Sequence, residues 1–289
     1  MLAITWNIQW GRGVDGRVDL ERIVATARAM GDFDLLCLQE VADNYPGLKG
    51  AAPGDNQFAR LAQLLPGYHA TEGIAVERHT PGLGRQRFGN MIFSRTPPLQ
   101  VLRHQLPWPA DALVASMPRM ALEIVIDSAA GPMRVITAHL EYYSLRQRTA
   151  QLEALRALQS EAAGHAADPA WPERQGQPFE TRPREGRALL CGDFNCDARD
   201  PLVARFQQGL AGAPAWTDAW KLANPGQRHP TTVGLYDDDQ WKGEHQCFDF
   251  FFVSSDLAGA VRRVEANSAT QASDHQPLLI EIDFARQMR

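Results

Sequence analysis

The sequence has few cysteines, with only four among its 289 residues. This number excludes the dense disulfide framework of small secreted proteins, and a chain of this length can bury enough apolar surface to fold without cross-links. Cys37 and Cys191 lie in apolar runs, and no second cysteine pair with zinc-ligand spacing accompanies Cys191 and Cys196. We therefore expect reduced thiols and a cytoplasmic protein.

Long apolar runs are also lacking. No stretch reaches the roughly 18 consecutive apolar residues that a membrane-spanning helix needs, so we expect no integral membrane association. The opening residues, Met1 to Trp6, resemble a core strand and not the basic and apolar leader of a secreted protein.

An excess of positive charge is absent too. The chain carries 29 lysines and arginines against 34 aspartates and glutamates, which gives a formal net charge of −5. This balance disfavours a protein that coats nucleic acid without sequence preference, although a local basic groove stays compatible with it. Hydrophobic residues make up 44% of the chain and charged residues 22%, values that exclude a wholly disordered chain.

Strand patterns alternate with helix patterns along the whole chain. Phe33 to Leu38 is a nearly continuous apolar run, as expected of a strand buried on both faces. Ser144 and Gln147 form a capping box that opens the clearest helix pattern. No change of composition marks a boundary, so we expect a single domain over residues 1–289.

One segment, residues 164–186, differs from the rest. It contains four prolines and shows no periodicity, which predicts an exposed loop insertion. Replacing it by a short glycine–serine linker should then cost little stability. A flap that faces the substrate is the alternative interpretation.

Polar side chains whose chemistry suits catalysis or metal binding stand at or next to the ends of apolar runs. Loops that follow strands in α/β proteins converge on one edge of the sheet, so these side chains are expected to lie together. They are Asn7, Glu40, His139, Asp193, Asn195, Asp249, Asp274 and His275.

Five short motifs carry all of these residues except Asp249, in a fixed order. They are Thr5-Trp6-Asn7-Ile8, Leu38-Gln39-Glu40, Thr137-Ala138-His139-Leu140, Gly192-Asp193-Phe194-Asn195 and Ser273-Asp274-His275-Gln276-Pro277. The set resembles the endonuclease/exonuclease/phosphatase superfamily of metal-dependent phosphoesterases, from about residue 2 to residue 284. The resemblance implies a four-layer α/β/β/α sandwich with two central, mostly antiparallel sheets, whereas periodicity alone predicts only an α/β or α+β protein.

Two positions depart from the family pattern. Cys247-Phe248-Asp249 stands where Arg-Ile-Asp or a close variant is frequent, and Glu141 follows His139 where an aspartate is common. Neither change removes a core catalytic group, and no subfamily is assigned.

The resemblance implies a metal site on the first part of the chain. Glu40 would be the principal ligand, with Asn7 close by and Asp274 completing the site. Carboxylate and amide oxygens suit hard cations, so the expected cofactor is Mg²⁺ or Mn²⁺.

The resemblance also implies catalytic roles. Asp193 would be the general base or orient the attacking water, and Asn195 would hold that water or a phosphate oxygen. Residues two apart on a strand point the same way, which would place both side chains together. His275, oriented by Asp249, and His139 would donate to phosphoryl oxygens, and the sequence leaves open which histidine protonates the leaving group.

Two further residues are candidates for contact with the substrate phosphate. Asn90 follows Arg87-Phe88-Gly89, and Thr231 follows His229-Pro230. A simple turn explains both positions equally well.

The predicted activity is hydrolysis of a phosphoester or phosphodiester by in-line attack of an activated water, as in a nuclease or small phosphodiesterase. The substrate stays open among nucleic acids, nucleotides, phosphorylated small molecules and lipid headgroups, and a monomer is favoured. One alternative is a noncatalytic phosphate-ligand-binding protein on the same fold, which would be expected to lose one of the catalytic groups. A zinc hydrolase that uses His139 and His275 is a further alternative, but it lacks the close histidine spacing of zinc sites.

Overall fold

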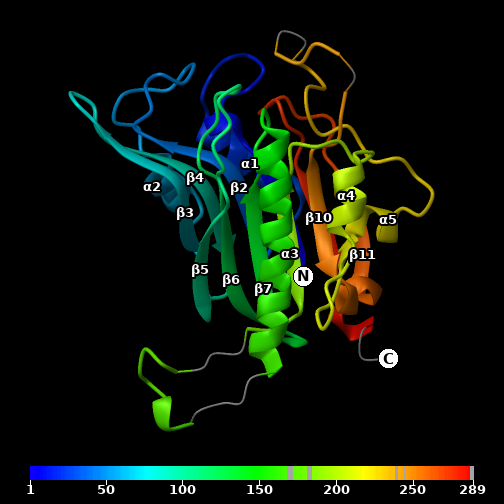
Figure 1. Cartoon of the computed structure of the whole chain (residues 1–289). Helices are drawn as coiled ribbons and strands as arrows, with labels where there is room; N and C mark the ends of the chain where they lie inside the picture. Colours follow the sequence, from blue (N-terminus) through cyan, green and yellow to red (C-terminus); the bar gives the residue numbers. More distant parts are fainter. Residues whose placement is uncertain (168–171, 181–183, 238–239, 244, 287–289) are drawn as a thin grey trace.

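The structure, a computed structural model, describes residues 1–167, 172–180, 184–237, 240–243 and 245–286. Two six-stranded sheets pack face to face, and helices cover their outer surfaces (Figure 1). Most neighbouring strands run antiparallel, so the layered sandwich with two mostly antiparallel sheets is confirmed.

The first sheet has the strand order β11-β12-β1-β2-β4-β3. Its strands are β1 (Leu2–Asn7), β2 (Leu35–Asp43), β3 (His69–Thr80), β4 (Gly84–Ser94), β11 (Val261–Ala266) and β12 (Leu278–Ile282). The second sheet has the order β5-β6-β7-β8-β10-β9. Its strands are β5 (Gln100–Gln105), β6 (Met120–Ser128), β7 (Gly131–His139), β8 (Ala188–Asp193), β9 (Trp216–Asp218) and β10 (Asp249–Ser254).

Helices complete the outer layers. The α-helices are α1 (Leu20–Met30), α2 (Gln57–Leu64), α3 (Leu145–Ala167), α4 (Pro201–Phe206) and α5 (Ala219–Ala223), and short 3₁₀ turns lie at Gln9–Gly11, Pro172–Arg174, Ser255–Ala260 and Phe284–Arg286. Buried side chains form three layers, one beneath α1 and α2, one between the sheets and one beneath α3 and α4. Each apolar stripe of a helix is thereby matched to the outer face of one sheet.

Each sheet contains one parallel pair of strands, and these pairs position the polar motifs. In the first sheet β1 runs parallel to β2, with Asn7 opposite Gln39. In the second sheet β7 runs parallel to β8, with His139 opposite Asp193. Because parallel strands end at the same edge, the motifs of each sheet reach that edge together.

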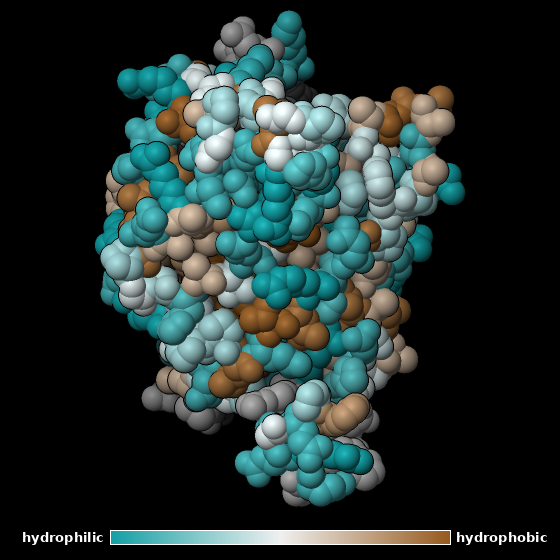
Figure 2. Space-filling view, turned by 90° about the vertical axis from the view of Figure 1, so that its left-hand side faces the viewer, coloured by the Kyte–Doolittle hydropathy of each residue, from teal (hydrophilic) through white to brown (hydrophobic). Residues whose placement is uncertain are grey.

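Hydrophobic surface is limited on the face shown in Figure 2. That face is mostly hydrophilic, and its hydrophobic side chains gather in separate patches. Within the described ranges, none of the helices combines the length and the apolar character needed to cross a bilayer.

The segment predicted as an exposed loop, residues 164–186, is partly helical and partly anchored. Its first residues belong to α3, which continues to Ala167, while residues 168–171 and 181–183 lie outside the described part. Arg184 is only 4% exposed. Its guanidinium lies 3.0 Å from Glu123 Oε1 on β6, so the prediction of exposure is wrong at this residue. A single buried arginine leaves no periodic pattern, which is why the sequence did not reveal it.

Candidate active site

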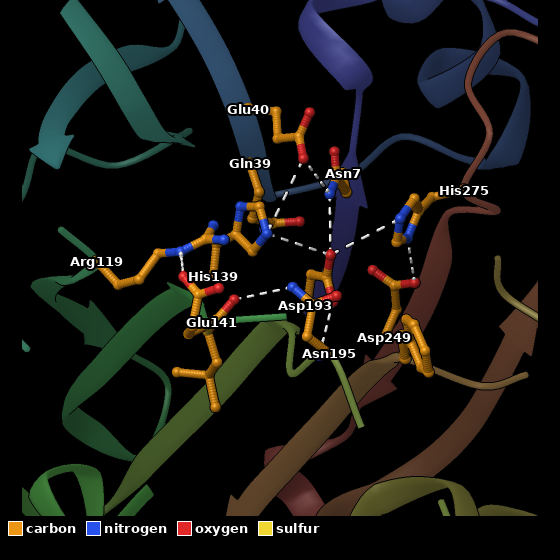
Figure 3. A network of polar contacts seen from close by, with 12 residues as sticks. Asn7, Gln39, Glu40, Arg119, His139, Glu141, Asp193, Asn195, Asp249 and His275 are labelled. Atoms are coloured by element: carbon orange, nitrogen blue, oxygen red, sulfur yellow. Dashed lines mark hydrogen bonds and ion pairs between the residues drawn. The ribbon is translucent and has the colours of Figure 1, made fainter. Parts of the chain in front are cut away.

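A polar cavity of about 440 Å³ opens at the edge where β1, β2, β7 and β8 end. Most of the residues predicted from the motifs line it, and the remaining two, Asn7 and Asp249, lie directly behind. The lining members are Glu40, His139, Asp193, Asn195, Asp274 and His275. The structure thus brings together residues that are up to 268 positions apart, since Asn7 and His275 contact the same aspartate, Asp193 (Figure 3).

Asn7 joins the two sheets through its side-chain amide. Its Nδ2 donates to Asp193 Oδ2 at 2.9 Å and to Glu40 Oε1 at 3.2 Å. Its Oδ1 accepts a hydrogen bond from the backbone N–H of Gln9 at 3.1 Å. In this arrangement Asn7 orients two carboxylates, and its oxygen would reach a cation only with the amide turned over.

Glu40 lies on an irregularity of β2. The register between β2 and β4 shifts between Leu38 and Val41, and Glu40 has a positive φ of 61°. A positive φ is costly for a residue with a Cβ, on the order of 1–3 kcal/mol. This bulge breaks the alternation of the strand, and the carboxylate of Glu40 reaches the cavity with its side chain 19% exposed.

Positive φ angles gather at this cavity. Five non-glycine residues of the described chain have them, and Gln9, Trp10, Glu40 and Asn195 are four of the five. All four line the cavity. Such clustering is a feature of functional sites, where neighbouring contacts hold a backbone that would otherwise relax.

A tight turn, and not strand alternation, brings Asp193 and Asn195 together. Strand β8 ends at Asp193, and Asn195 has a φ of 50°, so the expectation of continued strand geometry is wrong. The Asn195 N–H donates to Asp193 Oδ1 at 2.9 Å, and Asn195 Nδ2 donates to the carbonyl of Leu140 at 2.8 Å. Gly192 precedes Asp193 in β8 with a φ of 132°, and a Cβ there would lie 1.9 Å from the carbonyl oxygen of Ala138. Only glycine fits this position.

Asp193 lies between the two histidines. Its Oδ2 is 3.4 Å from His139 Nε2 and 3.7 Å from His275 Nε2. His275 Nδ1 is bound to Asp249 Oδ2 at 2.8 Å, which fixes how the ring faces the cavity. His139 Nε2 also lies 3.9 Å from Glu40 Oε1.

The carboxylates are crowded and buried, and this raises their proton affinity. Burial and repulsion from Asp274 raise the pKa of Glu40 to about 7. Burial raises the pKa of Asp193 to about 6, with Asp249 adding to the shift and His275 opposing it. A bound cation would relieve this repulsion.

The histidines shift in opposite directions. Burial, together with Arg119 and His275, lowers the pKa of His139 well below its ordinary value. Burial opposes protonation of His275 as well, but Asp249 and Asp193 outweigh it and raise the pKa of His275 well above its ordinary value.

The donor set fits a hard divalent cation. In the part of the chain that the structure describes, no group of three or more His, Cys, Asp or Glu side chains is arranged as a metal site. Mg²⁺ commonly binds through one or two carboxylates and keeps several waters, so it does not need such a group. Glu40 and Asp274 supply carboxylates at the cavity, and Asp274 Oδ2 is held by Gln240 Nε2 at 2.8 Å and Trp241 Nε1 at 3.1 Å.

Arg119 is a further candidate residue, which the sequence reasoning missed. It lines the cavity, is only 7% exposed, and its Nε lies 3.3 Å from Glu141 Oε2. Its Nη1 is buried without a hydrogen-bond partner among the described residues. Arg119 precedes β6 instead of following a strand, but β6 is antiparallel to β7, so its start lies at the same edge as His139. Glu141, at a position where the family commonly has aspartate, thus holds the guanidinium of Arg119 at the cavity.

The two candidate phosphate contacts are not among the residues that line this cavity. Asn90 Nδ2 donates to the carbonyl of Met120 at 3.2 Å. Thr231 lies along a second cavity of about 470 Å³, together with Arg228 and His229. Its neighbour Thr232 accepts the N–H of Asp249 at 3.1 Å and so fixes the start of β10.

Comparison with known proteins agrees with this geometry. The model of the Endonuclease/Exonuclease/phosphatase family matches residues 4–275. Comparison with curated proteins gives no match.

Three solved structures illustrate the shared fold. An endonuclease/exonuclease/phosphatase from Beutenbergia cavernae has 22% identity and a TM-score of 0.69, over 98% of this chain and 72% of that one. A mannosyl-6-phosphatase from Bacteroides thetaiotaomicron has 17% identity and a TM-score of 0.64, over 98% of this chain and 99% of that one. A 3′ phosphatase from Neisseria, bound to a product DNA hairpin, has 18% identity and a TM-score of 0.57, again over 98% and 99%.

Proposed function

Since the chain belongs to the endonuclease/exonuclease/phosphatase family, we propose that it is a divalent-metal-dependent hydrolase that cleaves a phosphoester or phosphodiester bond. The observation that carries the proposal is the convergence of three nitrogen atoms on Asp193 Oδ2, from Asn7 at 2.9 Å, His139 at 3.4 Å and His275 at 3.7 Å. A buried carboxylate with this surrounding can receive the proton of an attacking water while its position stays fixed.

In the proposed reaction Asp193 orients and deprotonates the water. The Asn195 N–H holds the second oxygen of Asp193, so Oδ2 is the atom that faces the cavity. Asn195 takes part in holding the water or a phosphate oxygen next to it. The attack is in line with the bond that breaks.

Positive groups on both sides of Asp193 would hold the phosphoryl group. His275 is fixed by Asp249 on one ring nitrogen, so its Nε2 can donate to a phosphoryl oxygen. Arg119, held by Glu141, has a free guanidinium nitrogen for a second oxygen. His139 is the proposed donor to the leaving oxygen.

Glu40 and Asp274, with Asn7 beside them, would hold Mg²⁺ or Mn²⁺. When bound, the cation supplies charge for the phosphoryl oxygens and lowers the barrier to forming the nucleophile. The carboxylate crowding described above supports this assignment, as do the oxygen ligands that Glu40 and Asp274 offer at the cavity.

A substrate panel tests the proposal. Purified protein is assayed with bis-p-nitrophenyl phosphate, p-nitrophenyl phosphate, nucleotides, sugar phosphates and single- and double-stranded nucleic acids, each with Mg²⁺, Mn²⁺ or excess chelator. We expect metal-dependent release of product from at least one phosphoester. Metal-dependent binding of phosphate ligands without turnover of any of them would instead support the noncatalytic alternative.

A further inference from the structure

The cavity has an aromatic rim above its polar floor. Four aromatic side chains belong to its lining, Trp10, Tyr142, Tyr143 and Trp241. Two of them are strongly exposed for residues of their size, Tyr142 at 40% and Tyr143 at 66%. Exposed apolar side chains that gather beside a cavity indicate a binding surface, because water is readily displaced from them.

The rim rings contact one another edge to face. The ring centroid of Tyr142 is 4.9 Å from that of Tyr143 at 82°, and 5.7 Å from that of Trp241 at 85°. The ring centroid of Phe248, which is not a lining residue, lies 6.1 Å from that of Tyr142. The rings therefore stabilise one another's positions and still leave ring surface open to the cavity.

Hydrogen bonds tie the rim to the floor. Trp241 Nε1 donates to Asp274 Oδ2 at 3.1 Å, and the backbone N–H of Tyr143 donates to Glu141 Oε1 at 2.9 Å. Glu141 also holds Arg119. The distance between a ring bound at the rim and a phosphoryl group bound at the floor is thereby fixed.

The tyrosine hydroxyls take no part in these contacts. Within the described residues, no hydrogen bond is found for the hydroxyl of Tyr142 or of Tyr143. We therefore expect the ring of each tyrosine, and not its hydroxyl, to contact a bound ligand. Phenylalanine is then a matched replacement.

The charges of the cavity disfavour a polyanion. Arg119 is the single arginine or lysine among the described lining residues, against the carboxylates of Glu40, Asp193 and Asp274. Proteins that bind extended nucleic acid neutralise several phosphates with lysine and arginine. This lining offers charge for one phosphoryl group.

We propose that the rim binds the ring of a small substrate, a monomeric phosphate ester in which one phosphoryl group is attached to a ring with a flat apolar face. The ring lies against Tyr142 and Tyr143 while the phosphoryl group lies at the floor. Aromatic rings and sugar rings both present such a face. The inference rests on the proposed function, because it uses the same cavity for the phosphoryl group.

Binding of phosphonates tests this inference without requiring turnover. Calorimetry with Mg²⁺ compares methylphosphonate, phenylphosphonate and glucose 6-phosphonate, which share the anion and differ in the attached group. We expect at least one ring compound to bind about tenfold more tightly than methylphosphonate, the size of a typical ring-stacking contribution. Whichever ring compound binds more tightly than methylphosphonate shows whether the rim prefers an aromatic ring or a sugar ring.

Substitutions at the rim test whether the tighter binding of the ring compound depends on Tyr142 and Tyr143. The preference for the ring compound should fall to about twofold or less in Tyr142→Ala or Tyr143→Ala, and persist in Tyr142→Phe and Tyr143→Phe. Phe179→Ala is the control, since Phe179 is 74% exposed and belongs to the segment at the opposite end of the molecule (Figure 1). Melting temperatures verify that each variant is folded.

Two results would overturn the inference while leaving the proposed function intact. One is Mg²⁺-dependent binding of methylphosphonate with no ring preference, or with a preference that both alanine variants retain. The other is binding of a single-stranded oligonucleotide more tightly than any phosphonate, with an affinity that falls steeply with salt. Failure of every phosphonate and of the oligonucleotide to bind would contradict the proposed function as well.

Discussion

Asp249 Oδ2 lies 2.8 Å from His275 Nδ1, and both side chains are buried. Asp249 begins a strand whose next four residues, Phe250 to Val253, are apolar, and an unpaired carboxylate would be costly there. The histidine is the partner that makes this position tolerable. The contact predicted from sequence is therefore present, and its catalytic role is open to test.

Asp249→Asn should lower turnover by about 10²-fold or more with a modest change in substrate binding, because the amide cannot fix the ring in the same tautomer. The double variant with His275→Ala should be barely worse than His275→Ala alone, since residues that act as one unit are not additive. Asp127→Asn, on an exposed residue of β6, is the control. Defects that multiply in the double variant would show that the two residues act separately.

Asp193→Asn should lower kcat by about 10²-fold or more, because the amide keeps the shape but cannot accept the proton of water. The fold should persist, and circular dichroism and the melting temperature verify this. An unchanged rate on the best substrate would mean that Asp193 only shapes the turn at the end of β8.

Removal of divalent metal should abolish activity. Chelator-treated protein should regain its rate with Mg²⁺ or Mn²⁺, and Glu40→Gln should require at least about tenfold more metal for half-maximal rate, because a carboxylate ligand is lost. A metal titration of both proteins gives this ratio. Full activity in excess chelator would contradict the dependence on a divalent metal.

Arg184 should contribute to stability although it belongs to the segment 164–186. Its Nε lies 3.0 Å from Glu123 Oε1, the same oxygen that Arg134 Nε contacts at 2.9 Å. Arg184→Ala should cost about 1–3 kcal/mol in denaturant unfolding at pH 7, because Glu123 would lose a buried charged donor. Arg174→Ala, on an exposed residue of the same segment, is the matched control.

The difference in unfolding free energy between wild type and Arg184→Ala should depend on pH through Glu123. Burial alone would raise its pKa, but the hydrogen bond from His104 and the pairs with Arg134 and Arg184 outweigh burial and lower it. A carboxylate with a lowered folded-state pKa stabilises the protein above its unfolded pKa, and this contribution is lost as pH falls below that value. Loss of Arg184 should leave Glu123 with a folded-state pKa higher than in the wild type, so the stability gap between wild type and Arg184→Ala should narrow as pH falls below the folded-state pKa of Glu123 in the variant. A gap that stays constant until both proteins unfold in acid would contradict the role of this carboxylate.

The sequence predicts well those features that repeat or follow a strand. The apolar runs before Asn7, His139 and Asp193 ended at one edge, as expected of strands with a common direction in parallel pairs. Two other features left no such trace. The bulge at Glu40 depends on pairing with β4, and Arg119 stands before its strand, so neither can be read from local periodicity.

The division of the site between the two sheets has a consequence for how activity could be rebuilt from pieces. The described strands of the first sheet lie within residues 2–94 and 261–282, and those of the second sheet lie within residues 100–254. Glu40 and Asn7 belong to the first set, whereas Asp193 and His139 belong to the second. A fragment that holds either sheet alone therefore carries only half of the proposed active site. Hydrolysis would reappear only on complementation of the fragments, which makes catalytic rate a direct reporter of whether the two sheets have docked.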